Sequence, residues 1–312
     1  MYKIIKQFKK IYDRPIILYR HILHILSPII SDKLYIKFLY RIETNSKLNL
    51  DNPQTFNEKL QWLKLYNRKP EYTQMVDKYA VKEYVANIIG KEYIIPTLGV
   101  WDRFEDIDFD KLPNQFVLKT THGGGGYGVV ICVNKSQFDK NRAKKILNKS
   151  LKTCIYKWYK EWPYKNVKKR IIAETYLTDD ISIDNPTGDL IDYKFYCFNG
   201  ETKAVVIATE RHSQTGVCFD YFDKDFNHLP FEQGGPNSKN VVNKPKRYEE
   251  MWNIANKLSK GLPHVRVDLY CIKGNIYFGE LTFFDSSGFA EFNPNEWDYK
   301  FGEWITLPEK TE

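Results

Sequence analysis

The pattern of apolar and polar residues is clearest near the C-terminal end of the chain, where it predicts a β-hairpin. Two runs rich in β-branched and aromatic residues, Val265–Ile272 and Ile276–Phe284, flank a short turn at residues 273–275. Successive side chains of a strand point to opposite faces of the sheet. Each run therefore divides into one apolar face and one face that carries the charged residues.

The charged faces of this hairpin predict a small oxygen cluster. The first strand presents Arg266 and Asp268 on one face, and the second presents Phe278, Glu280 and Thr282 on one face. If the two faces coincide, both acids and the hydroxyl lie beside the arginine. Oxygen clusters of this kind hold Mg²⁺, together with water and substrate phosphates. A single acid on an antiparallel strand is as often merely solvated, so the assignment depends on the rest of the chain.

Elsewhere the periodicity predicts alternating helices and strands, and the aromatic, acidic segment 293–307 is expected to wrap around the fold. Thr55 and Glu58 have the spacing of a capping box, and Ser136 is a candidate N-cap. Helices are expected at 1–45, Phe56–Tyr66, Tyr72–Ile89, 136–161 and Arg247–Lys260. Strands are expected at Tyr93–Val100, Phe116–Lys119, Val129–Val133, Arg170–Leu177, Tyr193–Phe198 and Thr202–Thr209. Within the helix expected at Tyr72–Ile89, Lys78 and Lys82 share a face, which is typical of a solvated helix edge.

A glycine-rich loop follows one of the predicted strands. The strand ends at Lys119 and leads into Thr120-Thr121-His122-Gly123-Gly124-Gly125-Gly126, after which another strand begins. This is neither a Walker loop nor a dinucleotide fingerprint, because a strand stands where both of those motifs need a helix. A glycine hairpin can still fold its backbone N–H groups over phosphates. The lysine directly before it favours phosphate binding over a merely mobile turn.

The bulk composition is that of a globular protein with an anionic partner. The 312 residues are 42% hydrophobic and 15% aromatic, enough for a substantial core, and no repeat or linker is evident. The net charge of +8 favours nucleotides, phosphorylated or uronic-acid sugars, nucleic acid or an anionic membrane face. Nucleic acid is disfavoured, because the aromatic residues alternate with aliphatic ones as in a core rather than forming stacking platforms.

The N-terminal residues and the cysteines bear on location. Residues 1–45 are basic and apolar, but no uninterrupted run reaches the length of a spanning helix, and no signal-peptide cleavage site is present. Two interpretations remain for this segment: packing against the main body, or an amphipathic helix that contacts a membrane or polysaccharide-assembly proteins. The five cysteines include no C-x-x-C pair. We therefore expect a cytoplasmic protein, in which the N-terminal segment is a candidate for peripheral contact with the inner face of the membrane.

Seven short motifs, in order along the chain, carry a resemblance to a known family. They are F-N-E-K-L-Q-W-L-K, V-D-K-Y-A-V-K, H-G-G-G-G, I-I-A-E-T-Y-L, D-Y-K-F-Y-C-F-N-G, V-R-V-D-L-Y and F-G-E-L-T-F. Each is weak alone, but the ordered set resembles the TupA-like members of the ATP-grasp superfamily. These proteins are associated with teichuronopeptide and other bacterial surface-polysaccharide pathways. The similarity covers residues 45–307.

The resemblance implies a fold and a division of the chain. The fold class is α+β: an ATP-grasp fold with two α+β lobes whose antiparallel sheets enclose the nucleotide site, preceded by a basic helical extension at 1–45. The remaining unit, 46–312, would comprise an N-terminal lobe at 46–115, a glycine-loop lobe at 116–190, and a metal-binding lobe with the C-terminal tail at 191–312.

The resemblance also implies a role for each matched residue, with ATP and Mg²⁺ as cofactors. The ATP phosphates would be bound by Lys78, Lys119, Lys194 and the loop residues Gly123, Gly124, Gly125 and Gly126. The adenosine would be held by Glu174, the backbone of Tyr176 and Leu177, and an acid of the next turn, Asp179 or Asp180. Mg²⁺ would be held by Asp268, Glu280 and Thr282. The substrate would be contacted by Arg211, His122 and Arg266, and Arg266 would also steady the developing oxyanion beside Lys119 and Lys194.

One residue departs from the family pattern, because Thr282 stands where the third metal ligand is usually Asn. A hydroxyl ligates Mg²⁺ less firmly than an amide carbonyl does, which puts a second metal ion in doubt. The implied reaction is the joining of a carboxylate to an amine through an acyl phosphate. Its partners would be an amino acid or amine and a carboxylated sugar of a surface glycan.

Two other functions remain open from the sequence. A glycosyltransferase of the same pathway would use Asp108-Phe109-Asp110 or Asp223-Lys224-Asp225 as a metal pair, but it leaves the lysine–glycine motif and Glu280 unexplained. A non-catalytic nucleotide-binding scaffold is favoured by Thr282 and by the basic N-terminal segment. Variants of the glycine-loop lysine and of the D-x-D acids would separate these hypotheses.

Overall fold

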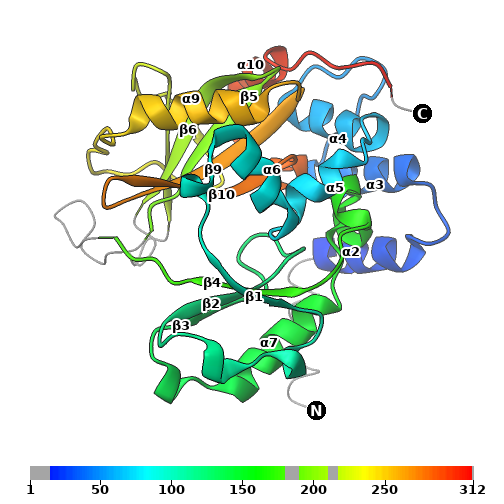
Figure 1. Cartoon of the computed structure of the whole chain (residues 1–312). Helices are drawn as coiled ribbons and strands as arrows, with labels where there is room; N and C mark the ends of the chain where they lie inside the picture. The colour runs from blue at the N-terminus through cyan, green and yellow to red at the C-terminus, as the bar shows by residue number, and fades with distance from the viewer. Residues whose placement is uncertain (1–14, 180–189, 210–216, 311–312) are drawn as a thin grey trace.

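The structure is a computed structural model that describes residues 15–179, 190–209 and 217–310. Two antiparallel sheets face each other, one in each of two lobes, and each sheet is covered by helices on the face that points away from the other (Figure 1). This confirms the predicted α+β class with two lobes. Within the described residues, no helix is both long enough and apolar enough to span a bilayer.

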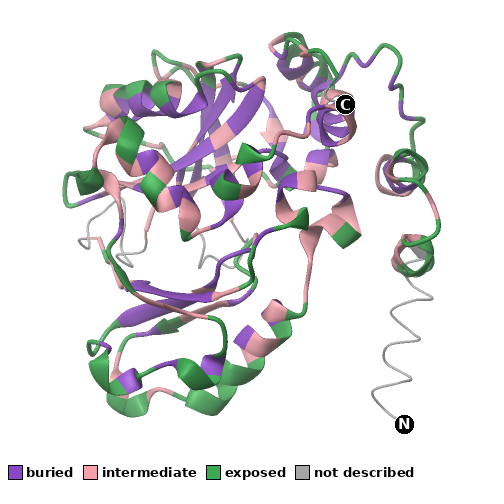
Figure 2. Ribbon diagram, turned by 45° about the vertical axis from the view of Figure 1, so that its right-hand side comes forward, coloured by how far each residue is buried: buried purple, intermediate pink, exposed green. Residues whose placement is uncertain are grey.

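The larger lobe is built on a five-stranded sheet with the order β10-β9-β5-β6-β7. Its strands are β5 (Tyr193–Phe198), β6 (Glu201–Thr209), β7 (Cys218–Phe222), β9 (His264–Ile272) and β10 (Asn275–Thr282). Asn199 and Gly200 both have positive φ angles, 50° and 86°, so they form the tight turn between β5 and β6 that the sequence predicts. Buried residues are concentrated in these strands (Figure 2).

Helices surround this sheet and complete the main hydrophobic core. Those of the large lobe are α4 (Phe56–Tyr66), α5 (Glu71–Val76), α6 (Ala80–Ile89), α9 (Tyr248–Ser259) and α10 (Glu296–Glu303), of which α9 packs across β5, β6 and β9. The capping box of Thr55 and Glu58 begins α4 as predicted. Phe56, at the first position of α4, is fully buried and contacts the rings of Phe198, Phe292 and Phe301. This aromatic contact fastens the tail segment to the lobe.

The smaller lobe has a four-stranded sheet with the order β1-β4-β2-β3. Its elements are β1 (Thr97–Trp101), β2 (Phe116–Thr120), β3 (Val129–Cys132), β4 (Ile171–Thr175) and α7 (Lys140–Leu151), with short 3₁₀ turns at Phe104–Asp106, Phe109–Lys111 and Lys135–Gln137. Further short elements join the lobes or edge the sheets: Lys91–Tyr93, α8 (Ile155–Tyr159), Trp162–Lys165, β8 (Glu232–Gln233), Asp285–Gly288 and β11 (Phe292–Asn293).

The lobe boundaries differ from the prediction, because residues 46–115 do not form a unit. Helices α4 to α6 pack in the core of the large lobe, whereas β1 pairs with β4 in the small lobe. Phe104, Phe109 and Leu112 lie in the small-lobe core together with Phe116 of β2. Sheet hydrogen bonding and core packing therefore divide the segment between the lobes, which its order along the chain does not reveal.

Two predicted helices are interrupted. The helix expected at Tyr72–Ile89 breaks into α5 and α6, because the Asp77 carboxylate accepts hydrogen bonds from the backbone N–H groups of Tyr79 and Ala80. The helix expected at 136–161 is shorter, and its N-cap is Asp139 rather than Ser136. The predicted strand at Tyr93–Val100 begins only at Thr97, after a 3₁₀ turn. The first break matters for function, since it leaves Lys78 in a non-helical segment between the lobes.

The basic N-terminal segment forms two helices within its described part, α2 (Pro15–Leu26) and α3 (Asp32–Thr44). They pack against α8 of the body. His24 stacks on Trp158 with ring centroids 3.7 Å apart, Tyr156 donates to Asp32 at 2.7 Å, and Lys160 donates to Ser27 at 2.6 Å. The interpretation that this segment packs on the body is confirmed for residues 15–45.

Candidate active site

A cavity of about 1020 Å³ lies between the two sheets, and both lobes contribute to its walls. Its polar lining comes mainly from the ends and inner faces of the strands and from the glycine loop: Lys78, Lys82, Lys119, Gly123, Gly124, Gly125, Gly126, Glu174, Lys194, Arg266, Asp268, Glu280, Thr282 and Asp285. Most of the residues that the sequence resemblance singled out are therefore gathered in one place. Apolar side chains from both lobes, Ile95, Val129, Ile131 and Phe278, also line the cavity and offer a surface to a flat ring.

The β9–β10 register brings the predicted oxygen cluster together. Glu280 pairs with Asp268, and Thr282 pairs with Arg266, so the charged faces of the two strands coincide. A β-bulge at Gly279 shifts the pairing between the strands, because Phe278 pairs with Leu269 whereas Glu280 pairs with Asp268. A Cβ at Gly279 would lie 3.0 Å from the backbone oxygen of Asp268. The bulge thus needs a glycine to sit close to the neighbouring strand.

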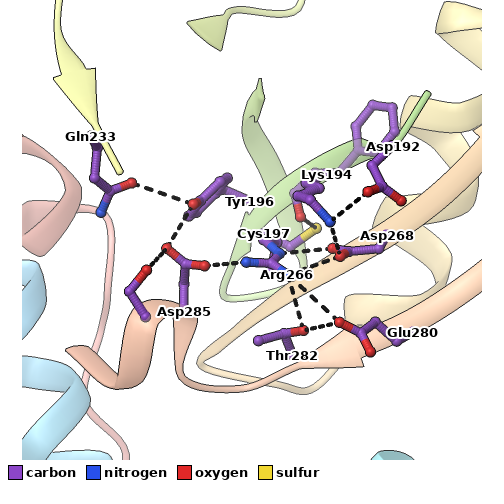
Figure 3. Close-up of polar contacts among 12 residues, drawn as sticks. Asp192, Lys194, Tyr196, Cys197, Gln233, Arg266, Asp268, Glu280, Thr282 and Asp285 are labelled. Atoms are coloured by element: carbon purple, nitrogen blue, oxygen red, sulfur yellow. Dashed lines mark hydrogen bonds and ion pairs between the residues drawn. The ribbon is translucent and has the colours of Figure 1, made fainter. Parts of the chain in front are cut away.

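Arg266 is the centre of the cluster (Figure 3). Its Nε and one terminal nitrogen donate to the two oxygens of Asp268, at 2.7 and 2.8 Å, and the other terminal nitrogen donates to Asp285. Thr282 Oγ1 accepts at 3.3 Å. Burial alone would lower the pKa of the guanidinium, but Asp268 and Asp285 reverse this and raise it well above its ordinary value. Arg266 is therefore a fixed, fully charged group on the cavity wall.

Two lysines hold the two acids of the hairpin from other elements. Lys78 Nζ lies 2.7 Å from Glu280 Oε2, and Lys194 Nζ lies 2.7 Å from Asp268 Oδ2. Burial by itself would raise the pKa of Glu280, but Lys78 and Arg266 lower it to about 2. The carboxylate is thus ionised at neutral pH, as a metal ligand must be.

Glu174 lies between two lysines at the end of β4. Its Oε1 is 2.5 Å from Lys82 Nζ and its Oε2 is 2.7 Å from Lys119 Nζ. Burial would raise its pKa, but Lys119 and Lys82 lower it, so this nearly buried acid stays charged. Lys82 also donates to the backbone oxygen of Ile95 at 2.6 Å. The sequence interpretation of Lys82 as a solvated helix edge was wrong.

The glycine loop joins β2 to β3 and has two different kinds of glycine. Gly125 and Gly126 have φ angles of +58° and +74° with open space around them, so they suit a loop that folds over a ligand. Gly128 is packed instead: a Cβ there would lie 2.2 Å from Ser150 Oγ and 2.6 Å from Thr120 Oγ1. The tip of the loop is therefore free to adapt while its base is anchored to α7.

Some predicted residues are not brought to the cavity, and others fall outside the described part of the chain. His122 is 3% exposed, its Nε2 is 3.1 Å from the backbone oxygen of Ser150, and it does not line the cavity. Its position supports a role in anchoring the loop base rather than in substrate contact. The side chains of Tyr176 and Leu177 are half-buried and also do not line it. Asp180 and Arg211 lie outside the described residues.

Sequence reasoning missed Lys82, Asp285, Tyr196 and Gln233. Asp285 accepts from Arg266 and, at 2.9 Å, from the hydroxyl of Tyr196, which is also 3.4 Å from Gln233 Oε1. Asp285 follows the hairpin within F-F-D-S-S-G, where consecutive Ser286 and Ser287 have φ angles of 47° and 55°. Such a segment is a signal of a constrained functional turn, but this becomes visible only with the backbone angles.

The chemistry of the donors fits Mg²⁺. Two carboxylates, Asp268 and Glu280, face the same cavity next to the Thr282 hydroxyl, and all are hard oxygen ligands. Among the described residues, no group of three or more His, Cys, Asp or Glu side chains is placed to hold a metal ion. A metal here would therefore complete its coordination with the hydroxyl, water and phosphate oxygens, which is the usual state of protein-bound Mg²⁺.

Neither D-x-D pair that the transferase hypothesis needs lies in the cavity. Asp108 is ion-paired with Lys111 on a 3₁₀ turn of the small lobe. Asp223 accepts hydrogen bonds from the backbone of Asp225 and Asn227 and so closes the turn after β7. Both pairs are explained as loop-forming residues, and neither is among the residues that line the cavity.

Comparison with known proteins identifies the family. The model of the family described as TupA-like ATPgrasp matches residues 58–306, and the chain belongs to this family. No curated protein matches the chain. Similar solved structures include a D-alanine–D-alanine ligase from Bacillus anthracis (16% identity, covering 67% of this chain and 57% of that chain, TM-score 0.40).

Two further structures are similar at the same level. They are the D-alanine–D-alanine ligase from Helicobacter pylori (14% identity, 81% and 70% covered, TM-score 0.40) and the ATP-grasp ligase PsnB complexed with a minimal precursor, Mg and ADP (11% identity, 72% and 57% covered, TM-score 0.38). The chain spans 57% of the length of the first two solved structures that it matches.

Proposed function

We propose that this protein is an ATP-dependent carboxylate–amine ligase that uses Mg²⁺. The substrates would be an amino acid or amine and a carboxylated sugar of a bacterial surface polysaccharide or its precursor. Family membership supports the proposal, and one observation carries it: Lys78, Lys194 and Arg266 converge on Asp268 and Glu280 inside a single cavity. This combination of cations and acids suits several anions and a hard metal ion together.

The reaction requires activation of the carboxylate, because attack by an amine would otherwise have to expel oxide. An oxygen of the substrate carboxylate attacks the γ-phosphorus of ATP, and the bond to the ADP oxygen breaks. The amine nitrogen then attacks the carbonyl carbon of the acyl phosphate. Phosphate leaves with the electron pair of the C–O bond, and the nitrogen gives up a proton to solvent. The products are an amide, ADP and phosphate, and no side chain acts as a nucleophile.

Four cations of the cavity have a task in this scheme. Lys78, Lys119 and Lys194 bind phosphate oxygens, and Arg266 stabilises the negative charge that develops on the acyl oxygen. Asp268, Glu280 and Thr282 would hold Mg²⁺, which supplies charge neutralisation for the phosphates when it is bound. Without ligands, the same lysines and acids neutralise each other. Binding therefore exchanges these ion pairs for contacts to phosphate and metal, so no buried charge is left unpaired.

Glu174 has a second task besides a contact with the adenine. Because it is bound by Lys82 as well as by Lys119, it keeps one counter-ion when Lys119 turns to a phosphate. Glu174 thus orients Lys119 in the absence of ATP. When ATP is bound, Lys82 remains as the counter-ion that keeps Glu174 ionised.

Product analysis tests the proposal. The purified protein is incubated with ATP and Mg²⁺ across a panel of uronic-acid sugars and amino acids, singly and in pairs. We expect ADP and phosphate only when both partners are present, and no turnover for Lys119→Ala or Glu280→Gln. ATP binding without substrate-stimulated hydrolysis would favour the scaffold, loss of turnover in Asp108→Asn or Asp223→Asn would favour the transferase, and release of AMP and pyrophosphate would overturn the acyl-phosphate mechanism.

We also propose a location for the protein: the cytoplasm, peripheral to the inner face of the membrane. All five cysteines are free thiols, which suits a reducing compartment. Residues 1–45 hold nine of the 47 lysines and arginines but only three of the 39 acids, so they carry +6 of the net charge of +8. This charge is complementary to anionic lipid.

An apolar face accompanies this charge on α2 and α3. Exposed apolar side chains recur at helical spacing along α2 and just beyond it: Leu18, Ile22, Ile25 and Ile29. Two more, Leu34 and Phe38, lie on α3 next to the exposed Lys33 and Lys37. We call these six residues the α2–α3 surface. A basic helix pair with an exposed apolar face is suited to lie in the headgroup region of an anionic bilayer. Polysaccharide-assembly proteins are the alternative partner.

A further inference from the structure

We propose that the part of the cavity over β6 and β7 is a subsite for the uncharged, hydroxyl-bearing ring of a sugar. The inference rests on the proposed ligase function and deepens it, because it names which part of the substrate this end of the cavity receives. It is carried by three features of the described lining residues: their lack of charge, an aromatic side chain, and a buried amide with an unpartnered atom.

The cavity crosses the whole inner face of the large sheet. Its floor begins at the acids and Arg266 on β10 and β9 and continues past Lys194 and Tyr196 on β5. Beyond them, strands β6, β7 and β8 and the segments next to them contribute Val206, Ala208, Val217, Phe219, Tyr221, Gln233 and Gly234. The phosphates and Mg²⁺ belong at the charged end, so the far end is free for another part of the reacting molecules.

The far end differs from the rest of the cavity in charge. None of the seven described residues that line it is ionisable at neutral pH, whereas the other end has Lys78, Lys194, Arg266, Asp268 and Glu280. A phosphate or carboxylate at the far end would lack a counter-ion among these residues. The occupant that this lining suits is neutral.

Phe219 gives this end an aromatic surface. Its side chain is half-buried, and it packs against a pair of glycines: a Cβ at Gly234 would lie 3.8 Å from its ring, and one at Gly235 would lie 3.0 Å from it. The glycines allow the ring to lie close to the backbone. The faces of an aromatic ring carry partial negative charge, and they attract the C–H groups on one face of a pyranose ring.

Gln233 and Tyr221 supply polar groups that can bind the hydroxyl groups of a sugar. The Tyr221 hydroxyl donates to Gln233 Oε1 at 2.8 Å, and Gln233, which is 3% exposed, has no partner for its Nε2 among the described residues. If the amide is turned over, its oxygen is the atom left without a partner. An unmatched buried amide atom costs about 1–3 kcal/mol. A small side-chain movement toward a ligand hydroxyl would satisfy it in either orientation, because a hydroxyl both donates and accepts.

The polar network also joins the two ends of the cavity. Gln233 contacts the Tyr196 hydroxyl, Tyr196 donates to Asp285, and Asp285 accepts from Arg266 (Figure 3). A sugar ring at the far end would therefore direct an attached carboxyl group toward Arg266, where the proposed reaction takes place. An uronic acid, which has its carboxyl group one bond from the ring, has this shape.

The test is saturation-transfer NMR of glucuronate, galacturonate, glucose and galactose with the wild-type protein in the presence of MgADP. We expect transfer to the ring protons of at least one sugar. The signal should fall about tenfold in Phe219→Leu, which keeps an apolar side chain, and in Gln233→Leu. The matched control is Gln137→Leu, which removes an amide from an exposed turn of the small lobe and should leave the signal unchanged.

Calorimetric titration with MgADP is run on all four proteins, and equal affinities would show that the variants are folded. The subsite is overturned if none of the four sugars receives saturation from a wild-type protein that binds MgADP, or if the signal persists in both variants. If the wild type does not bind MgADP, the proposed ligase function fails instead. Saturation that is lost in Phe219→Leu would even then support a sugar site at this end of the cavity.

Discussion

Lys78 Nζ and Glu280 Oε2 lie 2.7 Å apart although 202 residues separate them in the chain. Lys78 stands in the break between α5 and α6, and Glu280 stands on the strand that follows the bulge at Gly279. Two irregular features of the backbone, a broken helix and a bulged strand, thus bring Lys78 next to Glu280, the residues proposed to bind phosphate and metal. In the proposed function, this ion pair neutralises both charges until ATP and Mg²⁺ bind.

Lys78→Met is expected to weaken MgADP binding about tenfold or more, because a charge-assisted contact to phosphate is lost. Lys91→Met, which removes an exposed lysine outside the cavity, is the matched control and should not change the affinity. Isothermal titration with MgADP measures both. Equal affinities of Lys78→Met and the wild type would contradict the assignment of Lys78 to the phosphates.

Lys82 and Glu174 are expected to be energetically coupled. Lys82→Met should lower the free energy of unfolding by about 1–3 kcal/mol, since a nearly buried acid loses one of its two counter-ions. The loss in the double variant with Glu174→Gln should be smaller than the sum of the two single losses. Urea unfolding gives the three values, and strict additivity would show that the contact contributes nothing. Lys119→Met should weaken MgADP binding more than Lys82→Met does, because only Lys119 is assigned to a phosphate.

Thr282, the proposed third metal ligand, is expected to set the strength of the metal site. Thr282→Asn should increase the affinity for Mg²⁺ in the presence of ADP, because an amide carbonyl is a better ligand than a hydroxyl, and Thr282→Val should decrease it. Titration with Mn²⁺, followed by its electron paramagnetic resonance signal, measures both without any turnover. If Thr282→Val binds the ion as tightly as the wild type, the hydroxyl is not a ligand.

His264 should make the fold sensitive to mild acid. Its Nδ1 donates to the backbone oxygen of Cys197 at 2.9 Å, and its ring packs between Phe56 and Phe198. Burial lowers its pKa from 6.5 to about 4, so the unfolded chain binds a proton before the folded chain does. The neutral ring of His264 therefore stabilises the folded state, by on the order of 3 kcal/mol in the free energy of unfolding. This contribution is complete above pH 6.5 and is lost as the pH falls toward 4.

The measurement for His264 is the free energy of unfolding against pH. Below pH 6.5 it should fall less steeply in His264→Gln than in the wild type, while His21→Gln, on exposed α2, should follow the wild-type curve. Parallel curves for His264→Gln and the wild type would mean that other groups cause the acid sensitivity.

The α2–α3 surface is expected to bind anionic lipid. The protein should co-sediment with vesicles of phosphatidylcholine and phosphatidylglycerol, less so as salt is raised, and not with phosphatidylcholine alone. Ile25→Asp, at a side chain that is 72% exposed, should abolish binding, and Val241→Asp, at one that is 87% exposed, should not. Equal binding to both kinds of vesicle, or none to either, would contradict the lipid proposal. Self-association that Ile25→Asp abolishes would show instead that the surface joins two copies of the chain.

The sequence by itself determined what depends on neighbours along the chain. Period-two alternation predicted the β9–β10 hairpin, the Asn199-Gly200 turn predicted the β5–β6 hairpin, and the spacing of Thr55 and Glu58 predicted the start of α4. The order of the motifs indicated the family, and most of the residues that this resemblance implied for the site do line the cavity. These features are local, because alternation, turns and caps involve residues a few positions apart.

Only the tertiary structure decided which distant groups meet. It divided residues 46–115 between two lobes, placed Lys82 on Glu174, gave Arg266 a second carboxylate in Asp285, and turned His122 toward the backbone of α7. Each of these contacts joins segments whose approach is set by sheet order and core packing. Charge pairing across a cavity is decided by the distance between side-chain atoms in space, and no spacing along the sequence expresses that distance.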